Sequence, residues 1–286
     1  MCILKPFRRV VLACAAMLAM VSVVRATPVT STFGPVAGTT ITYSGSETDT
    51  QSPDPPSPTW LFGTPVISGS NNLHFTSDAT QTPRPIQFAV ITPGGEQLED
   101  GKLAIDATSI GSNSIALMSI TEGGDYLIAN GTALSTADAI LNITTATATV
   151  HVGPGNDVQI PLLPFITETF SQTSGSGPAI IEPTAIVFSG NGPLVTGTWQ
   201  GTANFNVPAA VVAAGLAGDQ VTKVEFTLDD ILLGNAQSGA MVEITKKDFL
   251  LGPPNNTPEP SSIILGVLGG LSLAAVGYRK KFAKTA

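Results

Sequence analysis

The chain has 286 residues, of which 13 are basic and 21 acidic, and a formal net charge of −8. Eight basic residues lie in the two terminal segments, so residues 27–277 hold five basic and all 21 acidic side chains, a net charge of −16. This charge disfavours nucleic acid as a partner, because an acidic surface repels phosphate backbones. Cys2 and Cys14 both precede residue 27, which excludes disulfides, cysteine metal clusters and thiolate catalysis in the rest of the chain.

The first 26 residues have the pattern of a secretion signal. Lys5, Arg8 and Arg9 precede the apolar run Val10–Val24, which is the order of a cationic region and a hydrophobic region in a signal peptide. We therefore expect export through the translocon and cleavage after Ala26. An uncleaved membrane anchor is the alternative, although this apolar run is short for a spanning helix.

The body, residues 27–256, consists of short β-branched runs separated by turn-forming residues. This pattern is typical of an all-β protein, either an antiparallel sandwich or a jelly roll. Turns are expected at Gly123-Gly124, Gly153–Asp157 and Asn191-Gly192. We predict strands at residues 39–43, 86–92, 102–107, 114–121, 126–129, 145–152, 158–163, 185–189, 195–199, 203–207, 222–228 and 241–244.

Two short stretches carry helix signals. Ser135-Thr136-Ala137-Asp138 has the spacing of a capping box before Ala139-Ile140-Leu141, and Pro208 opens an alanine-rich run over residues 209–216. The flexible composition of Gln172–Pro178 makes this segment the expected boundary if the body consists of two subdomains rather than one.

Residues 221–251 indicate a final hairpin with its turn near Gly234–Gly239. Val224, Phe226 and Leu228 alternate with polar residues, as on a half-buried strand. Acidic residues 229–230 and basic residues 246–247 flank the turn. We expect them to form exposed pairs across it, each worth about 0.2–1 kcal/mol.

The body contains few residues of the kinds that support catalysis. No Gly-x-Ser-x-Gly elbow, His-Glu-x-x-His helix or phosphate-binding loop occurs, and His74 and His151 are the only histidines. We therefore expect a non-enzymatic protein without a cofactor or metal, with a secreted hydrolase as the least favoured alternative. Two groups of acids in expected loops could offer oxygen ligands to calcium but lack EF-hand spacing: Glu47, Asp49 and Asp54, and Glu96, Glu99 and Asp100.

Thr145, Thr147 and Thr149 alternate with alanine and would line one face of a strand at intervals of about 6.8 Å. A regular row of hydroxyl and methyl groups can match a flat polysaccharide or an ice lattice. The competing interpretation is the solvated face of an edge strand.

The C-terminal segment combines three physically distinct parts. Pro258-Glu259-Pro260 is held extended by its two prolines. Residues 261–278 carry no charge and would form a helix of roughly 27 Å, just long enough to span a bilayer. A basic cap of Arg279, Lys280, Lys281 and Lys284 follows, which predicts a cytoplasmic C-terminus.

This arrangement resembles the PEP-CTERM sorting signal of exported bacterial proteins, a short domain that also carries an ice-binding-protein label. The resemblance covers residues 257–284 only. It implies recognition of the precursor in the inner membrane by an exosortase-type protease, and transfer of the body to the cell surface or to an exopolysaccharide matrix. A carbohydrate- or ice-binding extracellular module is the alternative function.

Overall fold

The computed structural model describes residues 29–50, 61–78, 80, 86 and 89–253. The expected signal peptide, the sorting motif, the membrane span and the basic cap lie outside these residues. Within them, no helix is both long enough and apolar enough to cross a membrane.

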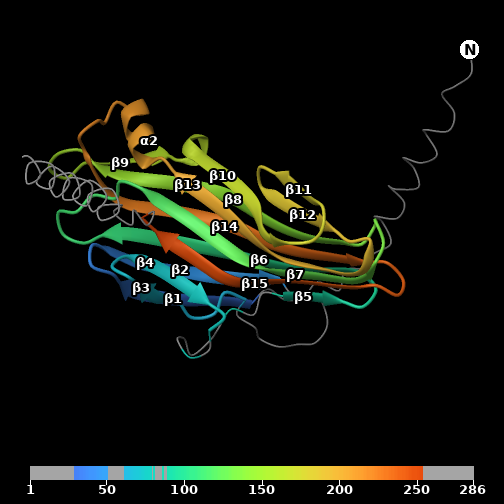
Figure 1. The fold of residues 1–286 in the computed structure, drawn as a ribbon. Helices are drawn as coiled ribbons and strands as arrows, with labels where there is room; N and C mark the ends of the chain where they lie inside the picture. Colours follow the sequence, from blue (N-terminus) through green and yellow to red (C-terminus); the bar gives the residue numbers. More distant parts are fainter. Residues whose placement is uncertain (1–28, 51–60, 79, 81–85, 87–88, 254–286) are drawn as a thin grey trace, which may run out of the picture.

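Two antiparallel sheets make up the described body (Figure 1). The eight-stranded sheet has the order β1 (Val29–Ala37), β2 (Ile41–Thr50), β6 (Gly95–Ser109), β14 (Gln220–Ala236), β8 (Thr136–His151), β12 (Ala185–Ser189) and β11 (Ala179–Glu182), and β9 (Asp157–Pro161) also pairs with β8. The seven-stranded sheet has the order β10 (Ile166–Gly175), β13 (Gly192–Phe205), β7 (Met118–Gly131), β15 (Met241–Gly252), β4 (Asn72–Thr76) and β3 (Val66–Ser68), and β5 (Ala89–Thr92) also pairs with β15.

The core lies between the two sheets and follows from a period of two along the strands. In β8, Ala137, Ala139 and Leu141 are fully buried, and Asp138 and Ile140 between them lie on the opposite face. Successive side chains of a strand point to opposite faces, so each long strand contributes every second residue to the core. The predicted all-β class is confirmed, and the facing sheets are consistent with a sandwich.

The predicted turn at Gly123-Gly124 is wrong, because both glycines lie inside the continuous strand β7. A Cβ atom at Gly124 would overlap the backbone carbonyl of Thr245 on the neighbouring strand β15 and lie 3.0 Å from the indole nitrogen of Trp199. Glycine is therefore required here by close packing and not by a reversal of the chain. The turns at Gly153–Asp157 and Asn191-Gly192 are confirmed, since they connect β8 to β9 and β12 to β13.

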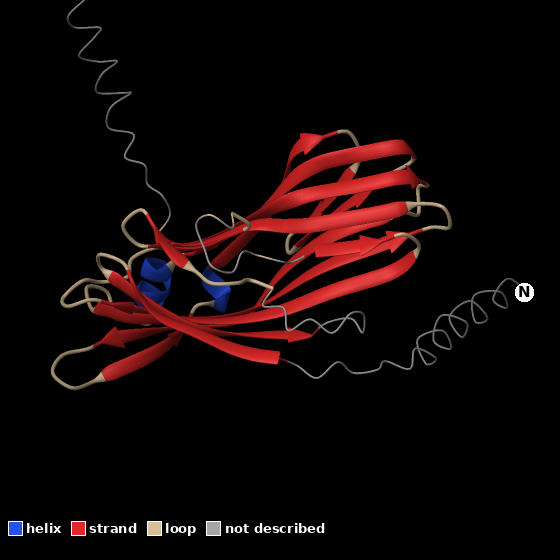
Figure 2. Ribbon diagram, turned by 90° about the horizontal axis from the view of Figure 1, so that it is seen from below, coloured by secondary structure: helices blue, strands red, loops and turns tan. Residues whose placement is uncertain are grey.

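One of the two predicted helices is confirmed. Helix α2 (Val207–Ala213) carries a proline in its first turn and is capped by Asn206, whose side chain accepts a hydrogen bond from the Ala209 N–H at 3.1 Å. It lies with the 3-10 helix η1 (Leu163–Phe165) at one end of the sandwich (Figure 2).

The predicted helix at 135–141 is wrong, because residues 136–151 form β8. Ser135 lies in the turn before this strand. Its hydroxyl accepts hydrogen bonds from the N–H group of Thr132 in the same turn at 3.3 Å and from the N–H group of Gln237, which follows β14, at 3.4 Å. Strand pairing on both sides of β8 overrides the local capping signal.

The predicted final hairpin is also wrong, since its two strands belong to different sheets. β14 pairs with β6 and β8, whereas β15 pairs with β7, β4 and β5. Residues 237–240 therefore carry the chain from one sheet to the other. This crossing brings inward side chains of β14 and β15 face to face across the core.

We expect Gly124→Ala to lower the free energy of unfolding by about 2 kcal/mol or more, because the added methyl must displace the backbone of β15. The measurement is urea unfolding followed by circular dichroism. Gly94→Ala is the control, since a Cβ there meets no atom of the described residues within 4 Å, and its effect should stay within about 0.5 kcal/mol. Equal stabilities for the two variants would contradict the packing role of Gly124.

Candidate functional site

The predicted threonine row lies on the outer face of the eight-stranded sheet. Thr145, Thr147 and Thr149 share one face of β8, with Ala146 and Ala148 buried between them. Thr147 and Thr149 lie where β8 pairs with β9 on one side and β14 on the other, so this part of the row is not at an edge; Thr145 pairs with Thr227 of β14 and precedes the residues that pair with β9.

The central threonine of this row is already engaged within the sheet. The Gln159 side-chain amide of β9 donates hydrogen bonds to Thr147 Oγ1 at 3.1 Å and to Glu225 Oε2 at 3.2 Å. A ligand that bound Thr147 would compete with these contacts. The binding role of this row stays a prediction.

A broader polar face covers the outside of the seven-stranded sheet. Thr167 and Thr169 of β10 lie directly opposite Asn204 and Thr202 of β13. Further along, Thr198 of β13 contacts two hydroxyl groups of β10, Thr173 at 2.6 Å and Ser174 at 2.8 Å. The sequence did not reveal this face, because β10 was not among the predicted strands.

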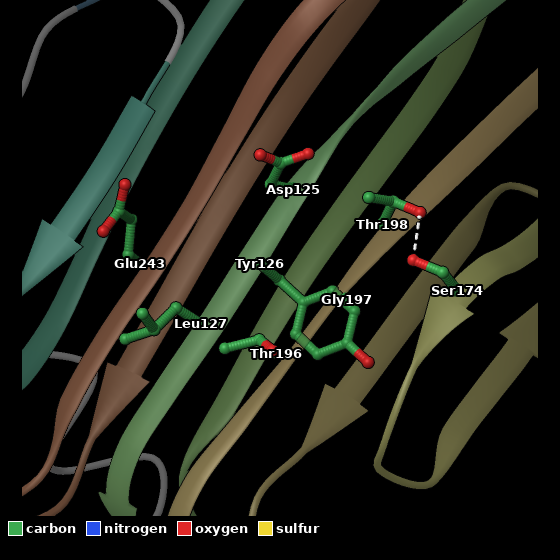
Figure 3. Close-up of a pocket in the computed structure, with 8 residues that line it drawn as sticks. All are labelled: Asp125, Tyr126, Leu127, Ser174, Thr196, Gly197, Thr198 and Glu243. Atoms are coloured by element: carbon green, nitrogen blue, oxygen red, sulfur yellow. Dashed lines mark hydrogen bonds between the residues drawn. The ribbon is translucent and has the colours of Figure 1, made fainter.

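A shallow hollow of about 360 Å³ opens in this face where β7, β13, β15 and the end of β10 meet (Figure 3). Asp125 and Glu243 supply two carboxylates to its wall, and the Ser174–Thr198 hydroxyl pair forms the opposite side. A Cβ atom at Gly197 would lie 2.6 Å from the Tyr126 hydroxyl, so glycine leaves room for that ring beneath the strand. The donors and acceptors fit a hydroxylated ligand lying flat on the sheet.

A second hollow, of about 530 Å³, lies on the same face nearer to β4. Its wall includes His74, whose Nε2 lies 3.3 Å from Asp248 Oδ1, and Lys247, which forms an ion pair with Asp125. His151 lies on the other sheet, with Nδ1 2.8 Å from Asp157 Oδ1. Within the described ranges, no three histidine, cysteine, aspartate or glutamate residues are placed to hold a metal ion.

The predicted loop positions of the acidic groups are wrong for the residues that the structure describes. Glu47 points into the core from β2 and accepts a hydrogen bond from the Phe62 N–H at 2.7 Å. Glu96, Glu99 and Asp100 belong to β6, where neighbouring side chains point to opposite faces and do not converge. Asp54 lies outside the described residues.

Lys246 is the centre of a buried cluster of charged side chains between the sheets. Its Nζ forms ion pairs with Glu122 of β7 and with Asp230 of β14, and all three side chains have no exposed area. The predicted pairing of residues 229–230 with 246–247 is thus partly confirmed. Its predicted location on the surface is wrong, because β14 and β15 face each other across the core.

Aromatic rings and glycine complete the surroundings of this cluster. Nζ of Lys246 lies 5.4 Å from the ring centroid of Phe62 and 5.7 Å from that of Phe249, distances at which a cation and a ring attract. A Cβ atom at Gly201 would lie 3.0 Å from Glu122 Oε1. Glycine therefore provides the space that the Glu122 carboxyl occupies.

Burial shifts both partners of this pair toward their neutral forms. Desolvation raises the pKa of Glu122, and the positive charge of Lys246 opposes that shift. Desolvation also lowers the pKa of Lys246, against the opposing effect of Glu122. The low polarity of the site favours an uncharged amine beside an uncharged carboxyl.

Asp138 is a second perturbed carboxyl, on the outer face of β8. It lies opposite Val187 of β12 and Leu233 of β14, and its Oδ1 is buried without a hydrogen-bond partner among the described residues. Burial is the main reason that its pKa is raised to about 6. A hydrogen bond with Thr136 opposes this shift, and the charge of Glu96 adds to it.

Comparison with known proteins gives no family. No family model and no curated protein match the chain. A structure of infectious bursal disease virus Gt strain aligns with 12% identity over 82% of this chain and 58% of that chain, at a TM-score of 0.12. An ENZbleach xylanase mutant aligns with 9% identity over 78% of this chain and 87% of that chain, at a TM-score of 0.16. The N-terminal cellulose-binding domain of Cellulomonas fimi β-1,4-glucanase C aligns with 10% identity over 59% of this chain and 91% of that chain, at a TM-score of 0.11. TM-scores this low carry no argument about fold or function.

We expect Asp138→Asn to stabilise the protein at pH 7.5 by about 1–2 kcal/mol, a figure reduced for the partial exposure of the side chain. Because the folded-state pKa lies above the ordinary value, protonation favours the folded state. The wild type should therefore gain stability as the pH falls through about 6, and the variant should lack this gain.

Urea unfolding at pH 5 and pH 7.5 measures both effects. Glu182→Gln is the control, because Glu182 is an exposed acid on β11 of the same sheet. A pH dependence that is the same in Asp138→Asn and in the wild type would contradict the assignment.

Proposed function

We propose that this chain is an exported, non-enzymatic structural protein of the cell surface or of an exopolysaccharide matrix. The observation that carries the proposal is the order of three elements at residues 257–284: Pro258-Glu259-Pro260, an uncharged stretch of membrane length and a basic cap. This order resembles the PEP-CTERM signal. A membrane precursor with a cytoplasmic C-terminus would thus be handed to an exosortase-type protease.

The described body supports this role through its surface and its core. Polar residues occupy most of the outer positions of β8 and β13, and apolar side chains fill the space between the sheets. Such a body can stay soluble outside the cell and can stabilise itself without the disulfides that many exported domains use.

The sorting proposal predicts that a Pro258→Ala, Glu259→Ala, Pro260→Ala variant stays in the membrane with its tail attached. The wild type should appear at the surface without its C-terminal tail. The variant loses the prolines that hold the motif extended, and the protease would then no longer recognise it. Cell fractionation with intact-mass measurement tests this. Pro254→Ala, a proline change upstream of the motif, should be processed normally. Wild-type surface material that still carries residues 261–278 would contradict tail removal.

A second candidate function is carbohydrate binding by the polar face of the seven-stranded sheet. The supporting observation is the hollow between Asp125, Glu243, Ser174 and Thr198, where carboxylates and hydroxyl groups offer hydrogen bonds to sugar hydroxyls. A matrix protein with this face would be held by the polysaccharide around it.

For this second function, we expect Thr198→Trp to weaken retention on exopolysaccharide by about tenfold or more, since the indole would fill the hollow. Affinity electrophoresis in gels that contain the polysaccharide gives the measurement. Thr147→Trp is the matched control on the opposite sheet and should leave retention unchanged. Loss of retention in Thr147→Trp alone would instead assign binding to the row Thr145, Thr147 and Thr149.

A further inference from the structure

Lys246, Glu122 and Asp230 meet in the core from three different strands. Lys246 Nζ contacts Asp230 Oδ2 across the interface between the sheets and Glu122 Oε2 on the neighbouring strand of its own sheet. None of the three side chains has any exposed area. An amine and two carboxyl groups are thus held together in a site that excludes bulk water.

Two of the four carboxyl oxygens in this cluster have no hydrogen-bond partner among the described residues. In the part of the chain that the structure describes, Asp230 Oδ1 and Glu122 Oε1 are buried and accept no hydrogen bond, whereas Asp230 Oδ2 and Glu122 Oε2 contact only Lys246 Nζ. A buried salt bridge compensates for lost hydration only when further hydrogen bonds satisfy its oxygens. Noncovalent ion pairing alone therefore accounts poorly for this arrangement.

We propose that Lys246 and Asp230 form an intramolecular amide bond between Nζ and Cγ, and that Glu122 is the catalytic residue that moves the protons. Asp230 Oδ2, which Nζ contacts, is bonded directly to Cγ, so the nucleophile and the electrophile are already adjacent. Glu122 Oε2 contacts the same nitrogen and can exchange a proton with it.

The reaction balances with water as its only by-product. Nζ of the neutral amine attacks Cγ of the protonated Asp230 carboxyl and forms the C–N bond. Glu122 accepts a proton from the nitrogen and donates one to the leaving hydroxyl group, and the C–O bond breaks as water departs. Glu122 ends in the state in which it began, and nothing is oxidised or reduced.

The site favours this reaction in two ways. Desolvation lowers the pKa of Lys246 and raises that of Glu122, which supplies a nucleophilic amine and a carboxyl able to donate a proton. The rings of Phe62 and Phe249 flank the nitrogen and limit the access of water that would hydrolyse the product. The amide product is uncharged and therefore does not carry the cost of burying an ion pair.

The bond would tie β14 of one sheet to β15 of the other. β15 is the last described strand and precedes the proposed sorting tail in the chain. A pull on the C-terminal side of β15 would then load a covalent bond and not only hydrogen bonds between strands. This inference concerns the body alone and does not depend on sorting.

Tryptic digestion of the denatured full-length protein tests the proposal directly. Between Lys223 and Lys247 the only tryptic site is Lys246, and acylated lysine is not cleaved. We expect a peptide of residues 224–247 that is lighter by one water, about 18 Da, with no fragment ions between residues 230 and 246. Cleavage after Lys246 in the wild type would overturn the proposal. A dehydrated aspartate elsewhere in the peptide would also remove one water, but it would leave Lys246 open to trypsin, so the cleavage pattern separates the two.

Variants separate the roles of the three residues. Lys246→Arg should restore cleavage at residue 246 at full peptide mass. Glu122→Gln should lose most of the bond while circular dichroism shows a folded protein, and complete bond formation in this variant would overturn the role of Glu122. Asp229→Asn is the matched control, because its side chain lies on the outer face of β14, and it should form the bond as the wild type does.

Discussion

Contact between β14 and β15 across the core determines how the two sheets fit together. Each strand is central in its own sheet, and residues 237–240 connect them directly. Along both strands the inward positions are apolar except where Asp230 meets Lys246. Burial of apolar surface is the main driving force for joining the sheets. The charged contact fixes their register, because a slip would leave charges buried without a counterion.

The sequence was sufficient for the fold class but not for the connections between strands. Short β-branched runs with turn residues predicted the antiparallel class, and Pro208 located α2. The predictions at Gly123-Gly124 and Ser135 are wrong because local patterns do not show when a glycine is needed for packing against another strand, or when a capping serine precedes a strand. The predicted final hairpin is wrong because hydrophobic alternation does not indicate which sheet a strand joins.

The buried cluster was only half visible in the sequence. The charges at 229–230 and 246–247 suggested pairing, but their burial depends on the sheet crossing. The sequence does contain a signal for its burial, because Lys246 follows Val242 and Ile244 at the two-residue spacing of side chains that point into the core. Glu122 carried a similar signal beside Ile120. The polar face of the seven-stranded sheet has no comparable signal in the sequence, because β10 pairs with a strand more than twenty residues away in the chain.

If the chain is exported as we propose, the central position of β15 has a consequence for how the body reaches its native state. A chain that leaves the translocon from its N-terminus delivers β7 and β4 long before the strand that must lie between them. The eight-stranded sheet lacks its central strand β14, and the seven-stranded sheet lacks β15, until residues 220–252 have emerged. A partly translocated chain would thus expose unpaired strand edges throughout most of its passage. A precursor tethered by its C-terminal end would acquire its structure beside the bilayer, after translation of the body is complete.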